Sequence, residues 1–384
     1  MKKQLLVISV AAAIAAPAAM ADVTAYGRIH VSGDMLSRTG KDTSAIVLGT
    51  ETKTTLPDAS GSRSNSLGLK GSIDSNIPDT KVVFQAEVGI DGNSSDTVAN
   101  TPNTGGAGAT AKAGVVWMRD TYGGLSNSAL GTVRGGIMSH SYKETHATID
   151  PLFTTALEGR GNLGLTSGKG NGYGADQGSM VGSVRYDSPS FAGVKVIAQV
   201  SKDLTAMNYV VGARYAAGPV ALSVDHINDG SVNALATGMT TAGTATMFAA
   251  KLSMAGVGLA VAYEMDGGAI SGTTEKTVGT VAKAATNNQF YGNVDYTMGN
   301  LMFVGSYGMK FDSEAATAGT KAKDGSSSWR VAAKYAVAKG SEIYAGYGAR
   351  TANEVLKGYD IGTTAGKVSV KENTVFTVGL STKF

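Results

Sequence analysis

The sequence predicts an all-β protein, a sixteen-stranded antiparallel transmembrane β-barrel. Three observations predict this class: short segments of alternating apolar and polar residues, connections that are alternately short and long, and an export signal at the N-terminus. The composition agrees, since the chain has 52 glycines, 7 prolines and no cysteine. That profile suits many short strands joined by glycine-containing turns.

The first 21 residues have the order of a secretory signal. Two lysines precede an apolar run, Leu5–Ala16, and Ala19-Met20-Ala21 follows as a small-residue cleavage site. The run is short and Pro17 interrupts it, which argues against a transmembrane helix. We expect cleavage after Ala21 and a barrel domain over residues 22–384. Cleavage would lower the formal net charge from +3 to +1, which gives no basis for binding nucleic acid.

Alternation with period two recurs along the rest of the chain. In "VTAYGRIHVSGD" the odd positions from Val23 to Val31 are apolar or glycine, and the even ones include Arg28 and His30. Such alternation is typical of strands with one apolar and one polar face. Sixteen segments are expected to be strands: 22–34, 63–74, 81–91, 112–125, 131–139, 179–187, 194–203, 207–217, 219–228, 245–255, 257–266, 287–298, 300–311, 327–337, 341–351 and 371–384.

The connections between these segments alternate in length. "SPSFAG", "AAGP", "MAGV", "MGN" and "AKGS" are tight, whereas the intervening stretches are long, polar and rich in Gly, Ser and Thr. Transmembrane barrels have short turns at one end and long loops at the other. A soluble sandwich or solenoid also has alternating strands, but it does not explain the export signal, the alternating connections and the even strand count together.

The last segment, "FTVGLSTKF", keeps an apolar face that contains Phe376, Val378, Leu380 and Phe384. In a closed barrel the last strand pairs with the first, near Val23–Val31, and leaves no edge. The apolar face is then in hydrocarbon. We expect Phe384 at the interfacial girdle, as a terminus needed for assembly.

These stretches resemble the trimeric, sixteen-stranded general porins of the Gram-negative outer membrane. The similarity rests on "VTAYGRIHVSGD", "NSLGLKGS" with "KVVFQAEVG", "MRDTYGGLSNSALGTVRGG", "DPLF", "VRYDSPSFAGVKVIAQ" and the terminal "FTVGLSTKF". The resemblance implies a passive diffusion channel in the outer membrane that is selective by size and charge. It also implies a homotrimer and contacts with outer-membrane lipid, lipopolysaccharide, the barrel-assembly machinery, and small ions and hydrophilic solutes.

In that family the third long loop folds into the barrel and forms a constriction. The corresponding loop here is about 140–178, and its carboxylates are Glu144, Asp150, Glu158 and Asp176. Asp150 in "DPLF" and Glu158 in "LEGRG" match the family's acidic segment best. The loop is therefore expected to bring Asp150 or Glu158 opposite Arg28, Arg119 and Arg185, with Glu144 as a further candidate.

The basic residues of the family's constriction are only partly matched in this sequence. Arg28, Arg119 and Arg185 occupy positions that match basic residues of the family, whereas the family's arginine before "LGFKG" is Ser66 here. Arg63 or Lys70 is a candidate replacement. Arg134 is added from periodicity alone, since it shares a face with Thr132 and Gly136. Facing rows of opposite charge at a narrow point select ions by size and sign.

Other functional signals are weak. His140, Glu144 and His146 lack the spacing of a helical metal motif, and "GLTSGKG" and "GTTAGKV" are one residue short of a phosphate loop. No catalytic set can be assembled, so neither an enzyme, a cofactor nor a metal is predicted. The alternatives are a substrate-specific outer-membrane channel and, less well supported, a non-conducting barrel adhesin or enzyme. Ion conductance distinguishes a channel from the non-conducting alternatives.

Overall fold

The computed structural model describes residues 21–42, 48–58, 65–90, 116–159, 178–202, 207–229, 243–266, 288–311, 326–359 and 368–384. The predicted signal segment lies outside the described residues except for Ala21. Arg63, Asp176 and the part of the third long loop after Gly159 also lie outside them.

Nearly all described residues belong to strands. Those before and around the third loop are β1 (Ala21–Asp42), β2 (Leu48–Asp58), β3 (Ser66–Asp74), β4 (Thr80–Ile90), β5 (Val116–Met118), β6 (Thr121–Asn127), β7 (Gly131–Ser139), β8 (Ser179–Asp187) and β9 (Val194–Lys202). Helix α2 (Ser141–Ile149) lies between β7 and β8.

In the second half of the chain, the described residues form strands and the short turns between them. The strands are β10 (Met207–Ala217), β11 (Val220–Asp229), β12 (Gly243–Met254), β13 (Val257–Asp266), β14 (Gln289–Met298), β15 (Leu301–Lys310), β16 (Ser326–Ala338), β17 (Ser341–Tyr359) and β18 (Val368–Lys383). Each pairs antiparallel with its neighbours in sequence.

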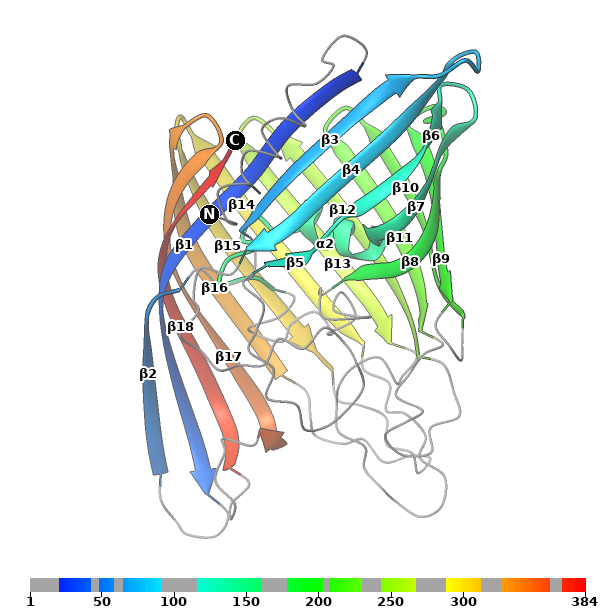
Figure 1. Ribbon diagram of the computed structural model, residues 1–384. Coiled ribbons are helices and arrows are strands. Elements are labelled where there is room, and N and C mark those ends of the chain that lie inside the picture. Colours follow the sequence, from blue (N-terminus) through cyan, green and yellow to red (C-terminus); the bar gives the residue numbers. More distant parts are fainter. Residues whose placement is uncertain are drawn as a thin grey trace, which may run out of the picture.

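The eighteen strand segments of the described chain fill sixteen positions in one closed barrel (Figure 1). β2 and β3 both pair with β1, one after the other along its length. β5 and β6 likewise share one position beside β4. Two pairs of segments thus count as one strand each, which confirms the predicted sixteen-stranded antiparallel barrel.

Pairing of β1 with β18 closes the barrel. The ladder runs from Arg28↔Lys383 to Asp42↔Val368, and Gly27 and Phe384 exchange backbone hydrogen bonds of 3.0 and 3.1 Å. The expected partner region, Val23–Val31, is therefore correct only in its second half. Residues 21–28 pair with β3 on the other side of β1. The Phe384 ring lies over Gly27, where an added Cβ would be 2.6 Å from its Cζ.

The two faces of the barrel wall have opposite character. Large apolar side chains on the outside are exposed, for example Val294 at 49 % and Trp329 at 45 %. The alternate positions are polar and buried, for example Asp225 at 0 % and Arg330 at 1 %. A soluble sandwich would bury the apolar face instead. The arrangement fits a barrel whose outer face meets hydrocarbon.

The short connections predicted from the sequence join the strands at the end of the barrel where the chain terminates, which is the upper end in Figure 1. Glycines with positive φ form several of these turns, among them Gly218, Gly256, Gly299 and Gly340. Only glycine adopts this conformation without strain. Among the described residues, no helix is long and apolar enough to cross a membrane.

Candidate functional site

Residues 140–159 form a segment inside the barrel, which we call the inner segment. It consists of His140, helix α2 and a turn from Asp150 to Gly159. His140 is the N-cap of α2, and its Nδ1 accepts a hydrogen bond of 3.2 Å from the Lys143 backbone N–H. The sequence led us to expect this stretch as a loop, and a nine-residue helix is a feature that periodicity did not indicate.

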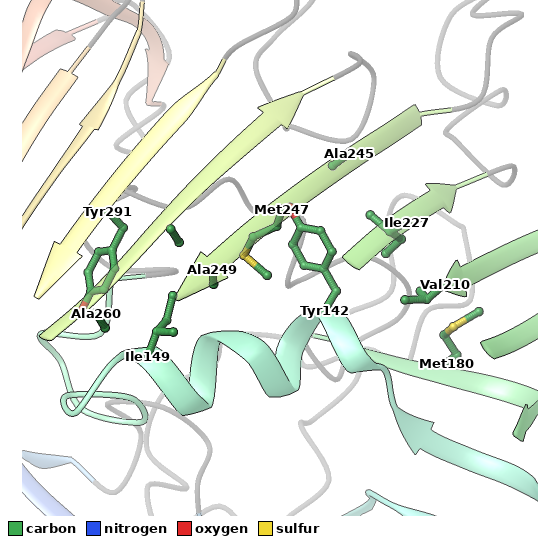
Figure 2. Packing of buried hydrophobic residues seen from close by; sticks show 11 residues of the cluster. Tyr142, Ile149, Met180, Val210, Ile227, Ala245, Met247, Ala249, Ala260 and Tyr291 are labelled. Carbon is green, nitrogen blue, oxygen red and sulfur yellow. The ribbon is translucent and has the colours of Figure 1, made fainter. Parts of the chain in front are cut away.

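One face of α2 packs against the inner wall of β10–β13 (Figure 2). Tyr142 and Ile149 point from the helix onto a patch of inward apolar residues, which comprises Met180, Val210, Ile227, Ala245, Met247, Ala249, Ala260, Ala262 and Tyr291. Many of these are small, so the helix can approach the strands closely. Ala147 and Thr148 on the opposite face are exposed to the lumen.

A buried carboxylate attaches the start of α2 to the wall. Asp225 on β11 accepts hydrogen bonds of 2.6 Å from both Ser141 Oγ and Thr145 Oγ1. The Arg214 guanidinium binds the same carboxylate with two bonds of 2.9 Å and donates a third, of 2.7 Å, to the Ser141 carbonyl. Gly212 leaves room for this approach, since a Cβ there would be 2.5 Å from Asp225 Oδ1. Such charge-assisted bonds are stronger than neutral ones.

Further polar contacts fix the rest of the helix. Tyr142 donates its hydroxyl to Glu264 on β13. Lys251 Nζ donates to the Thr148 carbonyl at 2.8 Å, near the C-terminal end of α2, where a cation also complements the helix dipole. Lys334 on β16 donates to the Pro151 carbonyl at 3.0 Å. The inner segment is thus attached to the wall from β10 to β16.

The acidic side chains of the turn, Asp150 and Glu158, point back into the inner segment and bond to its own backbone. Asp150 is 6 % exposed, and its carboxylate accepts from the backbone N–H groups of Leu152 at 2.9 Å and Gly159 at 2.8 Å. Glu158, also 6 % exposed, accepts from the Thr154 N–H at 2.8 Å. Both carboxylates act electrostatically on the buried Arg330 guanidinium of β16.

Arg330 of the barrel wall contacts the turn through its charge and through a hydrogen bond to Leu157. It lies over the Tyr291 ring, 5.5 Å from the centroid, and its Nη1 donates to the Leu157 carbonyl at 3.5 Å. The apolar residues Leu152, Ala156 and Leu157 pack beside it against Val304, Ala332 and Val375 of β15, β16 and β18. Alternation in "SWRVAAKYAV" puts Arg330 on the polar face of its strand and so predicts no more than an inward side chain. Its partnership with the turn depends on contacts across more than 170 residues, which the sequence pattern does not contain.

The wall formed by β1 and β3–β6 carries the other predicted cations. Arg28 Nη1 donates to Thr154 Oγ1 of the inner segment at 2.9 Å. Arg119 binds Glu87 at 2.5 Å, and Tyr26 donates to the same carboxylate at 2.7 Å. Lys70 lies over the Tyr26 ring, 5.1 Å from its centroid, and supplies a cation on the face where Ser66 pairs with Arg28.

Strands β7 and β8 continue this wall with an ion network. Arg185 binds Glu144 of the inner segment through two bonds of 2.6 and 2.9 Å, and it also binds Asp187. Arg134 binds Asp187 and lies 4.9 Å from the centroid of the Tyr122 ring. Lys195 completes the network with a contact of 3.2 Å to Asp187. Among the predicted loop carboxylates that the structure describes, Glu144 is the most accessible, with its side chain 43 % exposed.

The predicted site residues thus fall into two groups. Arg28, Lys70, Arg119, Arg134, Arg185 and Glu144 lie along β1–β8 or contact that wall, whereas Asp150 and Glu158 lie beside Arg330 on β16. Sequence periodicity identified the inward cations and Glu87 as an inward acid that offsets them, but not the pairing of Glu87 with Arg119 or the part that Asp187 plays.

A family model of Gram-negative porins matches residues 8–354 of the chain. The chain belongs to the Gram-negative porin family. The porin is an outer-membrane diffusion channel, as the closed barrel with its apolar outer face and polar lumen also indicates. No curated protein matches the chain.

Several solved barrels share the fold of this porin. The anion-selective porin from Comamonas acidovorans has a TM-score of 0.64 and 15% sequence identity, over 95% of this chain and 100% of that one. OmpF of Salmonella typhi in complex with daunomycin has a TM-score of 0.62 and 15% identity, over 94% and 97%. The trimer form of Vibrio cholerae OmpT has a TM-score of 0.60 and 12% identity, over 95% and 100%.

Proposed function

We propose that this porin is a general diffusion channel in which small hydrophilic solutes and ions pass a constriction between the inner segment and β1–β8. The observation that carries the proposal is the fixed position of the inner segment, which is attached to the wall at Asp225, Glu264 and Arg330. A segment held in this way reduces the bore permanently. Selection by size follows from the reduced bore, and selection by charge from the side chains around it. The proposal includes no catalysis and no cofactor.

The accessible charges at this level favour anions. Arg28, Lys70, Arg119 and Arg134 face the lumen, and Glu87 and Asp187 beside them are 12% and 5% exposed at their side chains. Asp150 and Glu158 are buried next to Arg330 and contribute little field to the open side. Among the described residues, the exposed opposing charges include Glu144 and Glu342, which acts electrostatically on Arg28. A row of cations at a narrow, partly dehydrated point raises the local concentration of anions.

Reversal potentials across a potassium chloride gradient test this proposal. We expect a sign that indicates anion preference at about 0.1 M salt, where the screening length is about 10 Å. Arg119→Ala should shift the potential toward cations, and Glu144→Gln should shift it toward anions. Both shifts should shrink near 1 M, where screening falls to about 3 Å. If both variants kept the wild-type reversal potential, these residues would not belong to the selective region. An absence of conductance would favour an adhesin.

We further propose that the porin is exported with residues 1–21 removed and assembles as a homotrimer. The signal-like order of residues 1–21 supports the first part. The trimer form of the OmpT structure supports the second, because it shows that a barrel of this fold can assemble in threes. Lipid, lipopolysaccharide and the barrel-assembly machinery are the expected partners. N-terminal sequencing of the mature protein and the number of conductance steps per insertion test the two statements.

A further inference from the structure

The outer wall of β14–β18 contains a hollow of about 580 Å³. Its floor is made of small residues on three adjacent strands, Gly305, Ala333 and Ala345. Its sides are aromatic and come from Phe303, Tyr347 and Phe376. The hollow is open toward the outside of the barrel rather than enclosed.

The strand register places the hollow on the face that meets the membrane. Ala333 pairs with Phe303 on one side and with Ala345 on the other, and Val331 pairs with Gly305 and with Tyr347. These positions alternate with the inward residues Arg330, Ala332 and Lys334, which contact the inner segment or its surroundings. Phe303, Tyr347 and Phe376 are 48%, 38% and 42% exposed. The hollow is therefore separated from the lumen by the barrel wall.

The hollow lies in the half of the barrel nearer the short turns. Phe303 is two residues past the start of β15, and Ala345 is four residues past the start of β17, and both strands begin directly after a short turn. With a rise of about 3.3 Å per residue and the usual strand tilt, the hollow extends from roughly 5 Å from the turn end at Phe303 to roughly 15 Å at Tyr347, six residues past the start of β17. Short turns of outer-membrane barrels are periplasmic. The hollow thus faces the acyl chains of the periplasmic leaflet.

A cation lies at headgroup depth, between the hollow and the turn end of the barrel. Lys339 occupies the turn between β16 and β17 and is exposed. It is six residues from both Ala333 and Ala345, roughly 20 Å along the strands at about 3.3 Å per residue. Lysines at this depth extend toward the interface and attract anionic headgroups.

We propose that this wall binds a phospholipid of the periplasmic leaflet, with one acyl chain in the hollow and the headgroup phosphate at Lys339. The proposal assigns the expected contact with lipid to one defined place on the wall. It rests on the membrane position of this wall and not on the charge selectivity of the channel. A flexible acyl chain can follow a groove between aromatic side chains. A second copy would offer another convex barrel wall, which reaches into the hollow only through a protruding side chain.

Fluorescence of Trp329 measures occupancy directly. The chain has two tryptophans, and the Trp329 ring lies 5.6 Å from the ring of Tyr347 at the edge of the hollow. In a Trp117→Phe background, detergent-solubilised porin is titrated with phosphatidylglycerol brominated in its acyl chains, at low mole fraction. We expect saturable quenching. Gly305→Leu together with Ala333→Leu fills the floor and should raise the half-saturating concentration at least fivefold.

Two further variants make the test specific. Ala250→Leu adds the same side chain on the outer face of β12, away from the hollow, and should leave half-saturation unchanged. Lys339→Gln leaves the hollow intact and should raise half-saturation about threefold. Retention of the heat-resistant folded band on gels verifies each barrel. An added Cβ at Gly305 meets only Val294 Cγ1, at 3.6 Å, so space for the first substitution exists.

Four results would overturn the proposal. Quenching that is unsaturable and equal in the filled and control variants would show ordinary annular lipid. A filled variant that changes the oligomeric mass in light scattering, without changing quenching, would show that a second copy covers the hollow. Displacement of the brominated lipid by lipopolysaccharide at lower concentration than by unlabelled phosphatidylglycerol would place the site in the other leaflet. If the filled variant does not fold, unchanged half-saturation in Lys339→Gln overturns the proposal.

Discussion

Replacing Asp225 with Asn should loosen the inner segment while keeping the barrel closed. The carboxylate is fully buried and accepts four hydrogen bonds, two from hydroxyls of α2 and two from Arg214. An amide of the same shape loses the negative charge and replaces one acceptor oxygen with a donor. Ser141 and Thr145 then have a neutral partner in place of a charged one.

The size of the effect follows from these contacts. A hydrogen bond to a charged group contributes about 1.5–3 kcal/mol, and a neutral one about 0.5–1.5 kcal/mol. The difference is about 1 kcal/mol for each of the two hydroxyls, so docking of α2 should weaken by about 2 kcal/mol. Since 1.4 kcal/mol corresponds to a factor of ten, the undocked fraction should rise about 30-fold.

Single-channel recording in planar bilayers measures this change. The wild type should conduct with little fluctuation, and Asp225→Asn should show frequent transitions between current levels. Asp295→Asn is the matched control, since this inward carboxylate bonds to Asn293 on its own strand. Ser141→Cys and Gly212→Cys, added to the Asp225→Asn variant, should form a disulfide that suppresses its current transitions. A Cβ at Gly212 would lie 3.3 Å from Ser141 Cβ. Equally steady current in the wild type and in Asp225→Asn would refute the assignment of Asp225 as an anchor.

Three other predictions concern the closure and the turn. Gly27→Ala should slow barrel assembly in lipid vesicles, because the new Cβ would lie 2.8 Å from the Ser66 carbonyl oxygen and 2.6 Å from the Phe384 ring. The assay follows the heat-resistant folded band on gels, and an unchanged rate of its appearance would contradict this prediction. Deletion of Phe384 removes two backbone bonds to Gly27 and should lower the folded amount in outer membranes, whereas an unchanged amount would exclude an assembly role. Gly346→Ala should lower thermal stability by about 1–3 kcal/mol through overpacking against Leu157, as measured by circular dichroism in detergent. An equal melting temperature for this variant and the wild type would show that the turn can move away from the added Cβ without loss of stability.

The barrel could be predicted from sequence because each strand carries its own signal. In β14, Val294, Tyr296 and Met298 alternate with Asn293 and Asp295, and the structure exposes the first set and buries the second. Period two assigns the faces without knowledge of the neighbours. The order of turns and loops then sets the topology, since an antiparallel meander has few alternatives.

The inner segment could be predicted only in outline. Its length and the "DPLF" motif indicated an inward loop, but α2 has a weak apolar pattern and contributes mainly Tyr142 and Ile149 to the wall. The choice of Arg330 as partner of Asp150 and Glu158 depends on which of several inward cations the turn meets in space. Local pattern holds no information about such a pairing.

The closure register was predicted only in part for a similar reason. β1 alternates from Val23 to Met35 and β18 from Phe376 to its end, so several alignments would keep Phe384 on the outer face. A shift by two residues preserves every inside and outside assignment. The observed alignment places the Phe384 ring over Gly27, one of the positions on β1 without a side chain. Steric fit of one aromatic ring thus selects among alignments that periodicity treats as equal.

Accessibility of Ala147 tests most directly whether the inner segment borders an open water-filled passage. Ala147 lies on the exposed face of α2, and the chain has no cysteine, so Ala147→Cys offers one reactive thiol. A methanethiosulfonate carrying a trimethylammonium group, added during single-channel recording, should lower the current in discrete steps and reduce anion flow less than cation flow. Val331→Cys, on the outer wall, should give no current change. Complete modification of Ala147→Cys, verified by mass, with an unaltered current would contradict the account.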